Sequence, residues 1–422
     1  MHRKTTMRPK AAYAIVIAML IMVVFSLYSA MLVKPASAYD FRIFYAAARA
    51  LQHGGNPYDI HQVFQQEQYL YPTLLKNRWQ WQFIQHNPYV QGPLLLVAFL
   101  PTLSWSPATI YPVSFALLIA VTAASLFLLA RLWPIRRSPL WTLFLMLSPI
   151  AFVGPFLGQI DAVLLLTLVL ALRWMQRGCA TYAGAILMVG LIKPQIMAGP
   201  ILLLAVLAWR RGKLASYGVG LVAGVVGIGA AVALVARPTL LVAWFSSMTQ
   251  FTQGNMYAQH DLSSLSTLYL GWMPHSLDAV LSAATLLAWG GACAWFWARV
   301  RTPADERWWF NIGLVGWLLV TPYAHPHDDI LLFPAMWIVV DHLPASRVGR
   351  MLTAVLFLSW CSLPLATILM GFKVEILASR GLGVVPIVCL ALVLLISARR
   401  PLTPDTGRVR AIADAHRHAV WG

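Results

Sequence analysis

Apolar residues gather in long runs that short polar stretches separate. Runs such as Ala11–Val33, Val219–Val235 and Gly381–Ala398 approach or reach the ~20 residues that a helix needs to cross a bilayer. Hydrophobic residues make up 59% of the 422, and the mean hydropathy is +0.70. A soluble domain of this length is far less apolar. The pattern predicts an all-α polytopic membrane protein.

The apolar runs predict about twelve membrane-spanning helices. We expect them at 11–33, 107–131, 139–157, 160–176, 179–193, 194–209, 214–236, 276–298, 308–323, 327–342, 350–370 and 379–398. The segment Pro93–Trp105 is apolar but short, and it contains two prolines. A full span needs a longer run. We therefore predict a re-entrant or half-buried helix there, with a thirteenth span as the alternative.

The charges orient these spans. The net charge is +17, but the basic residues lie in short clusters between apolar runs, which excludes a nucleic-acid-binding surface. With both termini in the cytoplasm, 22 Lys and Arg residues lie inside and nine outside, as the positive-inside rule requires. We predict one integral membrane domain over 1–398, with outer-face loops at 34–92 and 237–275. A basic cytoplasmic tail over 399–422 follows it.

Asp40 lies just after the first predicted span, where a carboxylate is close to the boundary between lipid and water. A partly dehydrated carboxylate can take a proton from a hydroxyl nucleophile. We predict that Asp40 is a general base. The structural alternative is a helix cap or a partner for Arg42 or Lys34.

Two charged residues at the predicted outer ends of helices are also candidates. Asp161 follows Gly158, Gln159 and Ile160, and Lys193 precedes Pro194. Acidic groups in membrane proteins are costly and usually have a function or a partner, and a lysine there suits a phosphate. The alternatives are an Asp161–Lys193 ion pair, an N-cap at Asp161, and a snorkelling lysine.

The turn Tyr323–Asp329 carries His325, His327 and two aspartates. Hydrogen bonding to a phosphate or sugar, a structural turn cap and a metal site remain open, although Pro326 disfavours a preformed pair of ligands on one helix face. The predicted topology places this turn on the same membrane face as Asp40, Asp161 and Lys193. Such a set of groups at one leaflet suits an anionic lipid head group.

Several of these stretches resemble glycosyltransferase family 87. The opening block is Asp40-Phe41, then Tyr45-Ala46-Ala47-Ala48, then Asn56-Pro57-Tyr58-Asp59. The stretch Gly158–Asp161, the pair Lys193-Pro194 and the turn before Leu331-Leu332-Phe333-Pro334 also resemble that family. The resemblance implies the GT-C fold, in which a large outer loop follows the first helix.

The resemblance also implies an inverting transfer of a hexose, with mannose favoured, from a polyprenyl-phosphate sugar to a lipid or glycan acceptor. Asp40 would deprotonate the acceptor, and no divalent metal cofactor is expected. The residues expected to contact the donor phosphate or sugar are Lys193, His325, His327, Asp161, Gln159, Arg42 and Tyr45.

The expected location is a bacterial cytoplasmic membrane, with the active site on the periplasmic or extracellular side. A transporter or flippase of lipid-linked glycans is the alternative, although many transporters contain internal repeats and this sequence shows none. A non-catalytic assembly subunit is a third possibility.

Overall fold

The computed structural model describes residues 38–72, 89–133, 142–143, 145–235, 237–254, 264–268, 275–342 and 387–392. All regular elements in these ranges are helical. The predicted spans 11–33 and 350–370 and the predicted tail lie outside them, as does most of 379–398.

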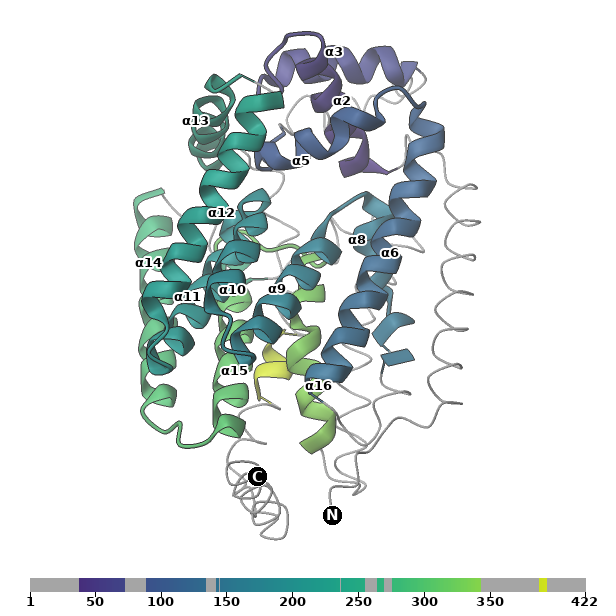
Figure 1. Ribbon diagram of the computed structural model, residues 1–422. Coiled ribbons are helices and arrows are strands. Elements are labelled where there is room, and N and C mark those ends of the chain that lie inside the picture. The colour runs from purple at the N-terminus through teal and green to yellow at the C-terminus, as the bar shows by residue number, and fades with distance from the viewer. Residues whose placement is uncertain are drawn as a thin grey trace, which may run out of the picture.

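Long helices form a bundle, and shorter helices cover one end of it (Figure 1). In chain order the α-helices are α2 (Tyr39–Gln52), α3 (Ile60–Leu70), α5 (Pro93–Phe99), α6 (Pro107–Leu132), α8 (Pro149–Leu157), α9 (Asp161–Gln176), α10 (Ala180–Leu187), α11 (Pro194–Arg210), α12 (Leu214–Val235), α13 (Thr239–Gly254), α14 (His275–Trp297), α15 (Pro303–Val320) and α16 (Phe333–His342). The 3₁₀ helices are η3 (Leu100–Thr102), η4 (Met188–Ile192), η5 (Leu265–Leu268) and η6 (Asp328–Leu332).

Three of the described helices are long and apolar enough to cross a membrane: α6, α12 and the part Leu277–Trp297 of α14. Other helices occupy predicted spans but are shorter. For example, α9 has 16 residues, which gives a length of ~24 Å against a hydrocarbon core of ~30 Å. The all-helical class is therefore confirmed, whereas the count of twelve spans is not.

Glycines allow α10 and α12 to approach closely. A Cβ atom at Gly224 would lie 2.6 Å from the carbonyl oxygen of Ala185, and one at Gly220 would overlap the carbonyl oxygen of Thr181. Small residues four apart are a common way for helices to associate in membranes, where burial of apolar surface drives little. The sequence Gly220-x-x-x-Gly224 therefore brings the α12 backbone against α10.

Helix α15 is fixed at both ends, and this positions the turn that follows it. Thr302 and Asp305 form a capping box at its start, which satisfies backbone donors of the first turn. Near the other end, the Trp317 indole donates to the carbonyl of Ile196 at 2.9 Å, and the Thr321 hydroxyl donates to the carbonyl of Gln195 at 3.0 Å. The turn after α15 is thus held beside the start of α11.

Helix α2 is buried on nearly every side. Its apolar residues include Phe41 and Phe44, and even Arg42 is only 2% exposed. The Nε atom of Arg42 donates to Oε1 of Glu67 on α3 at 2.8 Å. Burial raises the pKa of the Glu67 carboxyl, and the Arg42 guanidinium acts in the opposite direction. This ion pair joins α2 to α3.

The two predicted outer-face loops meet around residues 89–92. The Tyr58 hydroxyl donates to the carbonyl of Gln91 at 3.1 Å, and the Trp244 indole of α13 donates to the carbonyl of Val90 at 3.1 Å. The backbone N–H of Gly92 donates to the carbonyl of Ile192 at 2.9 Å. Helices α2, α3, α5 and α13 lie at one end of the molecule (Figure 1), and the Gly92–Ile192 hydrogen bond joins the start of α5 to η4.

Helix α5 with η3 forms the short apolar helix predicted over Pro93–Trp105. The helical part ends at Thr102, so it spans ten residues and is too short to cross a bilayer. It packs against α2, η4 and α12.

Gly158 brings α2 against the loop that precedes α9. Its φ is +87°, in the left-handed region where a side chain is disfavoured. A Cβ atom there would lie 2.6 Å from the backbone nitrogen of Phe41 and 2.7 Å from its Cα. The residue that follows Asp40 therefore touches the start of the stretch Gly158–Asp161.

We expect Gly158→Ala to destabilise the protein more than Gly178→Ala. Both glycines have positive φ, +87° and +77°, but a Cβ at Gly178 meets nothing within 4 Å. The left-handed backbone costs an alanine about 1–2 kcal/mol at either position, and only Gly158→Ala also displaces α2. Thermal unfolding of both variants in detergent tests this, and equal losses would contradict the packing of Phe41 against Gly158.

Candidate functional site

A buried ion-pair cluster lies where the loops at one end of the bundle meet. The Lys193 ammonium is 2.7 Å from Oδ1 of Asp161 and 2.9 Å from Oδ1 of Asp328. Each of these three side chains is at most 3% exposed. An Asp161–Lys193 ion pair was the structural alternative to a functional role for each of these residues. The structure confirms this ion pair.

Short local structures position the three charges. Asp161 is the first residue of α9, and Asp328 is the first residue of η6. Lys193 separates η4 from α11, where Pro194 begins the helix because its φ suits the first turn. Segments 32 and 135 residues apart in sequence therefore converge on one ammonium group.

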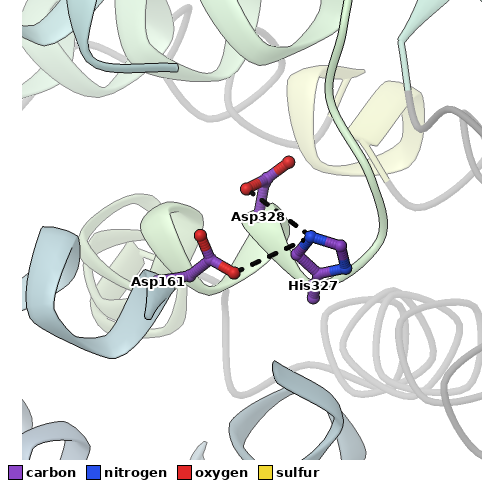
Figure 2. A group of neighbouring side chains, drawn as sticks. All are labelled: Asp161, His327 and Asp328. Atoms are coloured by element: carbon purple, nitrogen blue, oxygen red, sulfur yellow. Dashed lines mark ion pairs between the residues drawn. The ribbon is translucent and has the colours of Figure 1, made fainter. Parts of the chain in front are cut away.

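His327 extends this cluster. Its Nε2 atom is 3.9 Å from Oδ2 of Asp161 and 4.0 Å from Oδ1 of Asp328. Figure 2 shows both carboxylates near this ring nitrogen. The His325 ring stacks on the His327 ring at 5.2 Å, and the backbone N–H of His325 donates to Oδ2 of Asp328 at 2.8 Å. Both predicted histidines thus lie at the Asp161–Lys193 pair.

Three buried polar atoms here have no hydrogen-bond partner among the described residues: Oδ2 of Asp161, Nε2 of His327 and Oε1 of Gln159. A Cβ atom at Gly154 would lie 3.8 Å from Oδ2 of Asp161, 3.8 Å from Cβ of His327 and 3.9 Å from Cβ of Gln159. All three side chains therefore border the same glycine.

The formal charge of the cluster limits its chemistry. Asp161, Lys193 and Asp328 together sum to −1 when the histidines are neutral, and the carboxyl of Asp329 is buried next to Asp328. A buried net charge is unfavourable unless another charge or hydrogen bonds offset it. Because Lys193 already neutralises one carboxylate, an anionic ligand at this cluster needs a further positive charge.

Asp40 lies in the first turn of α2 and is half-buried. It is not the N-cap, since Ala38 occupies that position. A carboxylate in the first turn is stabilised by the helix dipole. The contact of Phe41 with Gly158 brings the start of α2 to the loop that leads to Asp161. The role of Asp40 as a base stays a prediction.

Arg42 and Tyr45 make contacts within the protein. Arg42 pairs with Glu67, and the Tyr45 hydroxyl donates to the carbonyl of Trp105 at 2.7 Å. These contacts fix α2 in the fold. These internal contacts do not test whether Arg42 or Tyr45 also contacts the donor, so that expectation stays a prediction.

A cavity of about 630 Å³ lies at the other end of α9, away from the cluster. Its lining includes Leu172 and Met175 of α9 together with Leu207, Arg211 and Arg307. Asp161 begins α9, whereas these residues lie near its end. This cavity therefore has no part in the predicted site.

The molecule thus combines apolar helices with a buried polar cluster at helix ends, an arrangement that fits a membrane enzyme. The model of glycosyltransferase family 87 matches residues 89–322, more than half of the chain. The chain belongs to glycosyltransferase family 87. No protein of curated function matches this sequence.

The family match includes Gln159, Asp161 and Lys193 but ends before His325, and it begins after Asp40. It identifies the chain as a glycosyltransferase and leaves the roles of single residues open. Apolar helices and family together support a membrane protein.

The predicted donor site omitted Asp328, which completes the cluster. The signal was present, because Asp328 lies in the same turn as the two predicted histidines. Glu67 was likewise not predicted as the partner of Arg42, because nothing in the sequence brings these two positions together.

We expect Lys193→Met to be strongly destabilising, since it leaves two buried carboxylates unpaired. Loss of one partner of a buried ion pair costs about 3–5 kcal/mol. Lys213→Met is the matched control, because Lys213 is exposed. Thermal unfolding in detergent tests the difference, and adding Asp161→Asn and Asp328→Asn to Lys193→Met should restore part of the loss. A mild effect of Lys193→Met alone would contradict the ion-pair assignment.

Proposed function

We propose that this glycosyltransferase moves a hexose, with mannose favoured, from a polyprenyl-phosphate sugar to a lipid or glycan acceptor. The reaction inverts the anomeric centre and takes place at the outer face of a bacterial cytoplasmic membrane. The observation that best supports the placement of the site is the contact of Phe41, next to Asp40, with Gly158. Through it, the first outer loop adjoins the stretch that begins α9.

In this proposal Asp40 takes the proton of the acceptor hydroxyl. The hydroxyl oxygen then forms a bond to the anomeric carbon, and the bond from that carbon to the phosphate oxygen breaks. Polyprenyl phosphate leaves as an anion, so no strong general acid is needed. General base catalysis of this kind contributes about 10²–10⁴-fold.

The donor phosphate is proposed to lie toward the cluster of Asp161, Lys193 and His327, with His325 and Gln159 beside it. Groups that stabilise charge developing on a leaving group contribute strongly when they are fixed in advance. The three positions of this cluster converge through packing and ion pairs, so the site needs little rearrangement. This proposal does not depend on whether a metal takes part. The metal-independent reaction expected from the sequence stays a prediction.

A transporter or flippase of lipid-linked glycans remains the second candidate. The family match favours the enzyme. A protein that moves a glycan across the membrane without transferring it would retain its activity when Asp40 loses its charge.

We expect Asp40→Asn to lower hexose transfer by at least ~10²-fold while the protein stays folded, because the variant keeps the shape and loses the base. Asp59→Asn is the control on the same loop. Asp59 caps α3 by accepting from the backbone N–H of His61, and asparagine caps equally well.

Transfer from labelled polyprenyl-phosphate mannose to native lipid extract measures both variants, with thermal unfolding as the check on folding. Undiminished transfer by Asp40→Asn would refute the base assignment. Equal losses in both variants would show that the loop tolerates neither change and that Asp40 has no special role.

A further inference from the structure

We propose that Asp161, His327 and Asp328 bind a divalent cation, with Oδ2 of Asp161, Nε2 of His327 and Oδ1 of Asp328 as ligand atoms. This differs from the metal-independent reaction that was expected from the family resemblance. The proposal stands on the geometry of the cluster and does not require the proposed transfer reaction.

The distances suit a common ligand. One possible ligand atom from each of the three residues lies within 4.8 Å of the other two. Nε2 of His327 is 3.9 Å from Oδ2 of Asp161 and 4.0 Å from Oδ1 of Asp328 (Figure 2). Two atoms that each lie ~2.1 Å from one ion are at most ~4.2 Å apart. The arrangement therefore needs only a small contraction to bind a cation. The same distances are too long for direct hydrogen bonds between the imidazole and the carboxylates.

Unsatisfied polar atoms give a second, independent indication. Oδ2 of Asp161 and Nε2 of His327 have no hydrogen-bond partner among the described residues, although both side chains are more than nine-tenths buried. Buried polar atoms rarely lack a partner unless an ion or water binds them. Oε1 of Gln159 also lacks a partner among the described residues, and the Cβ of Gln159 borders the same glycine, Gly154, so this side chain is a candidate source of a fourth ligand.

The charge of the cluster permits a cation. Asp161, Lys193 and Asp328 sum to −1 with neutral histidines, and a divalent ion changes this to +1. Lys193 binds Oδ1 of Asp161 and leaves Oδ2 available. It also donates to Oδ1 of Asp328 at 2.9 Å, so the cation would share this oxygen with the ammonium. If the proposed function holds, the added charge also offsets the phosphate of the donor.

The ligand set suits Mn²⁺ and related ions. Carboxylate and amide oxygens favour Mg²⁺ and Mn²⁺, and one imidazole nitrogen favours the transition metal. Mn²⁺ is also paramagnetic, which makes it a direct probe of the ligands.

The test is Mn²⁺ binding to the full chain in detergent after treatment with a chelator. We expect one tightly bound Mn²⁺ per chain and a rise in unfolding temperature on binding. Pulsed electron paramagnetic resonance should show coupling to the nitrogen of one coordinated histidine. Absence of stoichiometric binding by the wild-type protein, or binding without that nitrogen signal, would overturn the proposal.

The variant for this test is His327→Phe. Phenylalanine preserves a ring beside His325 and cannot bind metal, and the Lys193 ion pairs do not involve His327. We expect Mn²⁺ binding to weaken at least ~10-fold, the lower end of what even second-shell changes cost. His61→Phe is the control, because His61 is an exposed histidine near another aspartate, Asp59.

Equal Mn²⁺ affinity in His327→Phe and wild type would refute the site, and the cluster would then be a set of structural ion pairs only. Hexose transfer measured with and without chelator separates this result from the proposed function. Transfer that persists in a protein without a metal site leaves the glycosyltransferase intact and refutes the cation alone.

Discussion

The arrangement of this end of the molecule depends on one buried ammonium group. Lys193 is 3% exposed and lies between the carboxylates of Asp161 and Asp328. Removing three charges from water is costly, and their attraction offsets that cost only when the geometry is close. The lysine therefore fixes how the starts of α9, α11 and η6 approach one another. It also leaves a net negative charge beside two stacked histidines, and this charge decides which ligands the cluster can accept.

A second layer, built from the two loops predicted to lie at the outer face, covers the cluster end of the bundle. Helix α2 carries Asp40 and is held by the Arg42–Glu67 pair, by the Tyr45–Trp105 hydrogen bond and by contact with Gly158. The Gly92–Ile192 hydrogen bond joins α5 to η4, one residue before Lys193. The proposed reaction needs a general base and a phosphate site at a fixed separation. Packing of the two layers supplies such a fixed relation between α2 and the ion-pair cluster.

The sequence predicts those parts of the fold that depend on the local pattern of apolar and polar residues. The short helix that begins at Pro93 follows from its apolar run and from the proline at its start. The Asp161–Lys193 pair could be anticipated because acids are scarce and costly in an apolar chain. Asp328 and Glu67 could not be placed, since their partners are 135 and 25 residues away and only tertiary packing joins them. The count of twelve spans is not confirmed, because some predicted spans are helices shorter than a bilayer and others lie outside the described residues. The roles of Asp40 and the histidines are chemical questions that neither pattern nor packing answers.

The most direct test of the account is the choice of donor by the purified wild-type protein. Labelled mannose is supplied to it in native lipid extract, either as a polyprenyl-phosphate sugar or as a nucleotide sugar, and labelled product is measured. The account predicts product from the polyprenyl-phosphate donor and none from the nucleotide donor. Product from the nucleotide sugar alone would contradict it.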